Sequence, residues 1–289
     1  MITPTPCRIF LRLFQAVFAC GLGLSLAASI RAQVGPFDPY VLTAGDQGNI
    51  HIVQGNAVTA SFAAGTTAEY PIAVFDTVIR TTQSSASGTG REYTLGGVPT
   101  GAVFTLPSGI GSVFDGTTDG NFNYVVSYTL GNVYRLNLDF TNPVQLFASA
   151  FGSSLSITYD ATDNSIWLAS WSTNTVANYS MGGTVLSTFS ATVVGGSLSS
   201  LALDPTTGTL WMGSQSTQGT FYEYSKTGVL LQTVAYPSLV SQNTLGGEFA
   251  LAPVPEPGSW ALFALGAAML ARPWRLRGLS NGRSQAGPR

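Results

Sequence analysis

Leu155-Ser-Ile-Thr-Tyr-Asp160 and Asn164-Ser-Ile-Trp-Leu-Ala169 recur, 44 residues later, as Ser199-Ser-Leu-Ala-Leu-Asp204 and Gly208-Thr-Leu-Trp-Met-Gly213. In both copies one apolar run ends at an aspartate, and a second apolar run carries a tryptophan. Runs of β-branched and aromatic residues that end at Asp, Asn or Gly are typical of β-strands joined by tight turns. The repeat therefore predicts two equivalent units of β-structure.

Two further matches complete each unit. Asn178-Tyr-Ser180 corresponds to Glu223-Tyr-Ser225, and Gly183–Leu186 corresponds to Gly228–Leu231. Each unit thus contains four short strands, and four strands in about 40–45 residues are typical of one blade of a β-propeller. The repeat predicts an all-β fold.

The same pattern continues toward the N-terminus. One earlier blade is predicted from Val113–Asp115, Tyr124–Tyr128 and Val133–Leu136. Another is predicted, from a weaker pattern, in Ala73–Asp76, Val78–Thr82, Arg91–Leu95 and Ala102–Leu106. A two-sheet sandwich with accidental repetition is the alternative.

The first segment of the domain lacks one strand. Tyr40–Thr43, Asn49–Val53 and Ala57–Phe62 match the second to fourth strands of a blade, and Glu248–Ala252 has the form of a first strand. A blade shared between the two chain ends would close the ring and remove the free sheet edge. The prediction is a propeller of about five four-stranded blades. Over residues 38–252 it resembles NHL- and YVTN-type propellers.

The N-terminus has the pattern of a secretory signal peptide. Arg8 and Arg12 precede the apolar stretch Leu13–Ala28, and small residues follow it. A basic segment, an apolar segment and small residues at the cleavage site are the features of such a signal. Cleavage is expected after Ala32 or Ser29, so residues 1–32 are assigned to the signal peptide and residues 33–252 to the exported domain.

The C-terminal segment, residues 253–289, has the pattern of a membrane anchor. Pro255-Glu256-Pro257 is followed by the apolar run Trp260–Ala271 and then by Arg272, Arg275 and Arg277. The two prolines keep Glu256 in an extended segment. An apolar helix with positive charge on one side is expected to lie in a membrane with that side in the cytoplasm.

This order of elements resembles the PEP-CTERM tail, the sorting signal of exosortase substrates in Gram-negative bacteria. The resemblance implies that an exosortase-type enzyme recognises Pro255, Glu256 and Pro257, and that the precursor is held transiently in the inner membrane. It also implies a final location at the cell surface or outside the cell, together with exopolysaccharide. Such tails usually end at the arginine cluster, whereas here the polar segment Gly278–Arg289 follows it.

The exported domain is acidic. Residues 33–252 contain four basic and thirteen acidic residues, a net charge of −9, whereas the whole chain has a net charge of −2. Most of the arginines therefore lie in the two targeting segments. An acidic surface argues against nucleic acid or anionic lipid as a partner of this domain.

Residues capable of catalysis are few. Both cysteines, Cys7 and Cys20, lie in the signal peptide, and His51 is the single histidine. His51 lies between two isoleucines and is interpreted as a buried strand residue. Asp115–Asn121 and Asp160–Asn164 lack the ligand spacing of an EF-hand and are interpreted as turns. No catalytic residue, cofactor or metal site is predicted.

The tryptophans are assigned two roles. Trp167 and Trp211 occupy equivalent positions in the repeat, which predicts that both lie in the core between blades. Trp171 lies outside the repeat and is the candidate for an exposed stacking residue.

Three functions are compatible with these observations. The first is a non-enzymatic surface or matrix protein associated with exopolysaccharide or with another surface protein. The alternatives are a carbohydrate-active propeller enzyme and a ligand-binding or sensor propeller. An adhesin should carry exposed aromatic residues on one face, and an enzyme should gather polar residues at one mouth of the central channel.

Overall fold

The computed structural model describes residues 35–45, 48–85 and 88–251. The predicted signal peptide, the sorting motif Pro255–Pro257, the apolar run Trp260–Ala271 and the arginines at 272, 275 and 277 lie outside these residues. Within the described ranges, no helix has the length and apolar character needed to cross a membrane.

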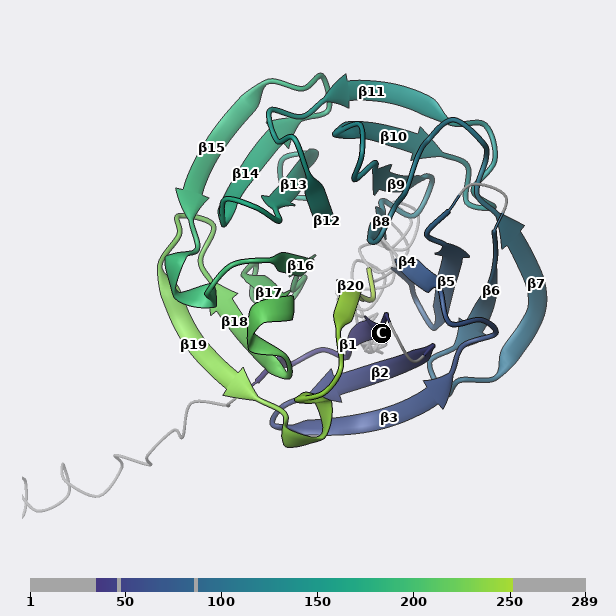
Figure 1. Cartoon of the computed structure of the whole chain (residues 1–289), viewed down its shortest axis with the longest axis horizontal. Helices are drawn as coiled ribbons and strands as arrows, with labels where there is room; N and C mark the ends of the chain where they lie inside the picture. The colour runs from purple at the N-terminus through teal and green to yellow at the C-terminus, as the bar shows by residue number, and fades with distance from the viewer. Residues whose placement is uncertain (1–34, 46–47, 86–87, 252–289) are drawn as a thin grey trace, which may run out of the picture. The chain divides into compact units, whose positions relative to one another are not determined.

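The described chain forms a β-propeller of five antiparallel four-stranded sheets arranged around a central axis (Figure 1). Blade 1 consists of β20 (Thr244–Phe249), β1 (Tyr40–Ala44), β2 (Asn49–Gln54) and β3 (Ala57–Ala63). Blade 2 consists of β4 (Glu69–Phe75), β5 (Val78–Gln83), β6 (Thr89–Thr94) and β7 (Pro99–Thr105).

The other three blades follow in chain order. Blade 3 consists of β8 (Gly116–Thr118), β9 (Asn123–Val126), β10 (Asn132–Leu136) and β11 (Val144–Ala148). Blade 4 consists of β12 (Ser154–Asp160), β13 (Ser165–Ser170), β14 (Thr175–Ser180) and β15 (Val185–Ser190). Blade 5 consists of β16 (Leu198–Leu203), β17 (Leu210–Ser214), β18 (Thr220–Tyr224) and β19 (Leu230–Ala235). Short 3-10 helices span Thr192–Val194, Gln215–Thr217 and Pro237–Leu239.

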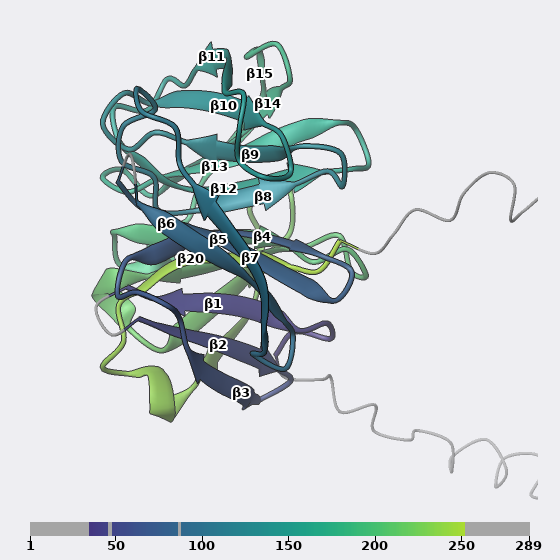
Figure 2. The ribbon, with the colours of Figure 1, turned by 90° about the vertical axis from the view of Figure 1, so that its right-hand side faces the viewer.

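The predicted ring closure is confirmed. β20 pairs with β1, with Tyr40 opposite Phe249 and Val41 opposite Glu248, and Figures 1 and 2 place the two strands side by side. The rings of Tyr40 and Phe249 stack with their centroids 4.7 Å apart. The closing strand begins at Thr244, earlier than predicted. Leu251 forms a parallel bridge to Phe75, so the last described residues also join blade 1 to blade 2.

The predicted first strand of blade 3 was misplaced. Val113–Asp115 precedes the strand, and β8 begins at Gly116. Asp115 does not belong to a surface turn, because its carboxylate lies in the channel and accepts backbone N–H groups of Gly116, Ile157 and Gly247. These donors come from blades 3, 4 and 1. A buried carboxylate needs hydrogen-bond donors. Asp115 is therefore placed by these three backbone N–H groups and does not pair as part of a strand.

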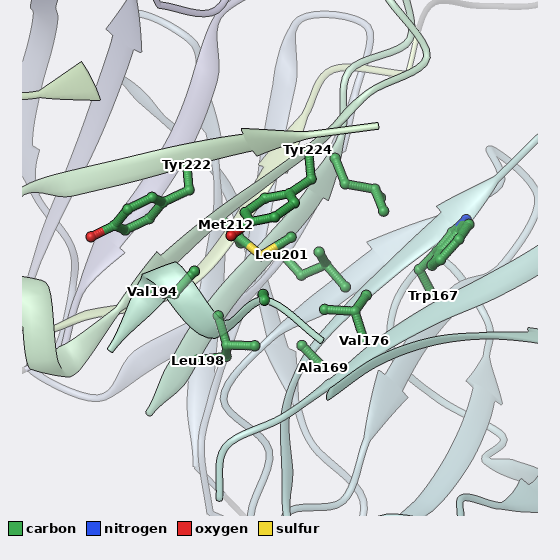
Figure 3. Close-up of a cluster of buried hydrophobic side chains, with 11 residues drawn as sticks. Trp167, Ala169, Val176, Val194, Leu198, Leu201, Met212, Tyr222 and Tyr224 are labelled. Atoms are coloured by element: carbon green, nitrogen blue, oxygen red, sulfur yellow. The ribbon is translucent and has the colours of Figure 1, made fainter. Parts of the chain in front are cut away.

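The prediction that Trp167 and Trp211 lie in the core between blades is confirmed. Trp167 is buried between blades 4 and 5 with Leu201, Met212 and Tyr224 (Figure 3). Trp211 is buried between blade 5 and blade 1, in a cluster that includes Tyr40, Phe221 and Phe249. The hydrophobic core of the propeller therefore lies between neighbouring blades, so each blade depends on the next for burial of its apolar face.

Candidate functional site

The two mouths of the channel are built from different loops. In blade 4 the start of β12 pairs with the end of β13, at Ser154 and Ser170, so Trp171 lies at one mouth. The turn after Asp160 lies at the other mouth. We call these the tryptophan face and the aspartate face.

Four aromatic side chains form a continuous row on the tryptophan face. Tyr70 stacks on Phe114 with centroids 5.8 Å apart, and Phe114 meets Tyr128 edge to face at 5.6 Å. Tyr128 meets Trp171 edge to face at 6.3 Å. All four side chains are partly exposed. We call these four residues the aromatic arc, and it extends across blades 2, 3 and 4.

A glycine brings the innermost strand against the arc. Gly246 of β20 has a φ of 82°, and a Cβ atom there would lie 2.6 Å from the carbonyl oxygen of Tyr70 and 2.9 Å from that of Phe114. Only glycine tolerates both this conformation and this approach. Since β20 is the channel strand of blade 1, the base of the arc lies at the channel mouth.

Trp171 is held in place by three hydrogen bonds. Its backbone N–H donates to Ser153 at 3.2 Å, and its carbonyl accepts from the N–H of Ser197 at 3.1 Å. Its indole Nε1 donates to Oε1 of Gln215 in blade 5 at 3.2 Å. The indole ring is therefore fixed while part of it faces solvent. Its stacking role remains a prediction.

The sequence analysis missed Tyr70, Phe114 and Tyr128. A signal for Tyr128 was present, because a serine stands at or directly after the end of the second strand of three blades, followed by one larger side chain: Ser127-Tyr128, Ser170-Trp171 and Ser214-Gln215. Alignment of the blades at this serine identifies Tyr128, Trp171 and Gln215 as neighbours around one mouth. Tyr70 and Phe114 have no comparable pattern, because their contact joins two blades.

The aspartate face contains a cavity of about 500 Å³. All five blades contribute to its lining, which includes Val74, Thr117, Thr118, Asp160, Thr162, Asp204, Thr206, Lys226, Glu248 and Leu251. Polar groups from different blades thus converge at this mouth. This is the arrangement that the enzyme and ligand-binding alternatives require.

Asp160 is fully paired in this cavity. Its Oδ2 lies 2.5 Å from Nζ of Lys226 and accepts Nε1 of Trp167 at 3.1 Å, and its Oδ1 accepts the N–H of Thr162 at 3.0 Å. Burial raises the pKa of Asp160, but the bonds from Lys226, Thr162 and Trp167 outweigh burial and hold this pKa below its usual value.

Two other carboxyl groups are buried at the centre of the channel. Burial raises the pKa of Glu248 to about 8, although Thr158 and the N–H of Phe249 donate hydrogen bonds to it. Burial also raises the pKa of Asp115 well above its usual value, and the nearby charge of Glu248 adds to the effect. Glu248 therefore holds a proton near neutral pH.

His51 belongs to neither mouth. It lies in β2, with its Nδ1 2.8 Å from Oγ of Ser61, and burial lowers its pKa. This agrees with its interpretation as a buried strand histidine. Within the described part of the chain, no three His, Cys, Asp or Glu side chains are grouped so as to hold a metal ion.

Comparisons with known proteins show the fold. No protein-family model matches the chain, and no curated protein gives a significant match. A chain in the crystal structure of the nidogen/laminin complex is similar, with a TM-score of 0.51, 14% identity, and coverage of 74% of this chain and 98% of that chain. Virginiamycin B lyase from Staphylococcus aureus has a TM-score of 0.44 and 15% identity, covering 70% of this chain and 71% of that chain. At these identities the likeness concerns the propeller architecture alone.

Proposed function

We propose that this chain is an exported, non-enzymatic surface or matrix protein whose propeller binds a neutral polysaccharide through the aromatic arc. The arc is the observation that carries the proposal. It presents four partly exposed rings in unbroken contact across three blades, and none of its members is charged.

The chemistry of the arc suits a sugar. Aromatic rings carry negative charge on their faces, and the C–H groups on one face of a pyranose ring are weakly positive. Tyrosine and tryptophan lose little conformational entropy on binding, because their side chains are rigid. The side chain of Tyr128 is partly exposed, so its hydroxyl can bond to a sugar hydroxyl.

The targeting segments support the location in the proposal. Export through the signal peptide of residues 1–32 places the domain outside the inner membrane. Recognition of Pro255, Glu256 and Pro257 by an exosortase-type enzyme then releases it or transfers it to the surface. The net charge of −9 in residues 33–252 is compatible with a neutral partner.

Substitution of Trp171 tests the binding site. We expect Trp171→Ala to weaken binding to neutral polysaccharide about tenfold or more, equivalent to about 1.4 kcal/mol, because a ring face is lost. Affinity electrophoresis of the exported domain measures this change. Trp171→Phe keeps a ring and should retain most of the affinity.

The matched control is Val185→Ala on the outer strand β15, where the side chain is 46% exposed and outside the arc. This variant should bind as the parent does. Unchanged binding by Trp171→Ala, with an unchanged melting temperature, would contradict the proposed site.

Substitution of the sorting motif tests the targeting. We expect a variant with alanine at positions 255, 256 and 257 to stay in the inner membrane, because Trp260–Ala271 still anchors the chain while the recognition element is lost. Fractionation of the producing cells measures the distribution. Arrival of this variant at the surface in normal amounts would show that the trio is not the sorting element.

The cavity on the aspartate face favours a second candidate function. A carboxyl group with a pKa of about 8, such as Glu248, is protonated at neutral pH and can act as a general acid. This would suit a carbohydrate-active enzyme or a small-ligand sensor. Release of reducing sugar ends by the parent, abolished in Glu248→Gln, would favour the enzyme over the binding protein.

A further inference from the structure

We propose that Asp204 and Asp38, at the edge of the cavity on the aspartate face, bind a divalent cation with oxygen ligands, of which Ca²⁺ is the expected one. The inference concerns the mouth opposite the aromatic arc and is independent of polysaccharide binding. It follows from a comparison of two turns that the sequence repeat makes equivalent.

The turns of blades 4 and 5 occupy the same position in the repeat and share an aspartate and a threonine. Asp160 and Thr162 in blade 4 correspond to Asp204 and Thr206 in blade 5. Each aspartate accepts the N–H of its threonine through Oδ1, at 3.0 Å in blade 4 and 2.8 Å in blade 5. The bond from the threonine N–H is therefore shared by the two turns, although Asp204 also accepts the N–H of Thr207 at 3.1 Å.

The neighbouring blade places opposite charges at the two turns. In blade 4, the hydroxyl of Thr162 accepts a hydrogen bond from Nζ of Lys226 at 2.9 Å. In blade 5, the hydroxyl of Thr206 donates to Oδ2 of Asp38 at 2.5 Å. The threonine hydroxyl of blade 5 thus bonds to the carboxylate of Asp38, whereas the threonine hydroxyl of blade 4 bonds to the ammonium group of Lys226.

Oδ2 of Asp204 lacks the lysine and indole partners that Oδ2 of Asp160 has. Asp204 is 0% exposed and lines the cavity, yet its Oδ2 has no hydrogen-bond partner in the described ranges. Nε1 of Trp211 also has none, whereas Nε1 of the equivalent Trp167 donates to Asp160. A buried carboxylate oxygen without a partner is costly unless a cation or donor binds it.

Charge balance favours a divalent ion. At the turn of blade 4, Lys226 forms an ion pair with Asp160, and the second carboxylate of that turn, Asp163, accepts hydrogen bonds from Ser165 and Asn178. Asp204 and Asp38 both bond to Thr206 at the turn of blade 5. Burial, together with the nearby charge of Asp38, raises the pKa of Asp204. Two carboxylates and a threonine hydroxyl are hard oxygen ligands, which suit Ca²⁺. With two carboxylates the affinity should be that of weak extracellular sites, with Kd of about 10⁻⁴–10⁻³ M.

Calorimetric titration of the whole exported chain with CaCl₂ tests the proposal. We expect one site in the parent, and binding at least tenfold weaker in both Asp204→Asn and Asp38→Asn. Asp139→Asn is the matched control, since the carboxylate of Asp139 accepts hydrogen bonds from Thr141 at an exposed turn of blade 3. This control should bind Ca²⁺ as the parent does.

A charge-reversal variant keeps the test decisive if an asparagine variant folds poorly. Asp38→Lys would place an ammonium group beside Thr206, as Lys226 does beside Thr162. We expect this variant to lose Ca²⁺ binding and to melt at a higher temperature than the parent in calcium-free buffer.

Three results would overturn the proposal. The first is no heat of binding at Ca²⁺ concentrations about tenfold above the expected Kd. The second is Ca²⁺ binding that persists in Asp204→Asn. The third is binding of methylammonium in place of Ca²⁺, which would show a site for an organic ammonium group.

Discussion

A chain that ends at Asn243 is expected to lose the cooperative unfolding of one that ends at Leu251. The shorter chain lacks β20, so the edge of β1 is left unpaired between Tyr40 and Ala44. It also loses the stacking of Phe249 on Tyr40 and the bond from Gly247 N–H to Asp115 at 3.1 Å. An open ring with an exposed edge should unfold in separate steps or aggregate.

Thermal unfolding of the two proteins measures this effect, with both beginning at residue 35. A graded variant, Phe249→Ala in the longer chain, should keep one cooperative transition and lose about 3–5 kcal/mol of stability, because a buried aromatic ring is removed. Equal melting of the chains ending at Asn243 and Leu251 would show that ring closure contributes nothing to stability.

Stability is expected to fall as the pH rises from about 4.5 to about 8, and Glu248 is one cause. Its ordinary pKa is 4.5, and burial raises the pKa in the folded protein to about 8. Between these values the folded state keeps a proton that the unfolded state has released, so a rise in pH favours unfolding. The loss is on the order of 3–5 kcal/mol across this window.

Glu248→Gln should remove this part of the pH dependence, because the amide stays neutral. Denaturant unfolding at several pH values measures the slope for parent and variant. Asp115 acts in the same direction, whereas the lowered pKa of His51 acts in the opposite direction below its ordinary value of 6.5. Both groups are present in parent and variant, so the difference between the two slopes reports the titration of Glu248 together with its charge coupling to Asp115. Identical slopes would contradict the protonated state of Glu248.

The sequence was sufficient to predict the ring because the repeat carries the pattern of the blades. The 44-residue offset between Trp167 and Trp211 fixed the blade length, and the missing first strand before Tyr40 predicted the closing strand. Burial of both tryptophans followed from their equivalent positions. The blade length, the closing strand and the burial of the tryptophans depend on contacts within one blade or between adjacent blades that share the same sequence pattern.

Contacts across the channel could not be predicted in this way. Asp115 was taken for a turn residue because its role depends on amides of Ile157 and Gly247, 42 and 132 residues away. The contact of Asp38 with Thr206 spans 168 residues and joins a segment outside the repeat to one inside it. Such pairs follow from the geometry of the closed ring, and the local pattern does not encode them.

The aromatic arc illustrates the same limit for the candidate site. Trp171 was singled out because it departs from the repeat, but its neighbours Tyr128 and Phe114 belong to blade 3. These residues belong to the candidate site only because loops from different blades lie next to each other in the folded ring. The predictions of a signal peptide and a sorting tail are based on the sequence of segments 1–32 and 253–289, which lie outside the described structure.

The most direct test of polysaccharide binding is to locate the sugar by fluorine NMR. Residues 35–251 contain three tryptophans, Trp167, Trp171 and Trp211, so labelling with 5-fluorotryptophan gives each a separate probe. Trp167 and Trp211 are each 1% exposed and serve as internal controls. Addition of a neutral oligosaccharide should shift and broaden the Trp171 resonance alone. Saturable binding of the sugar with an unchanged Trp171 resonance would contradict binding at the aromatic arc.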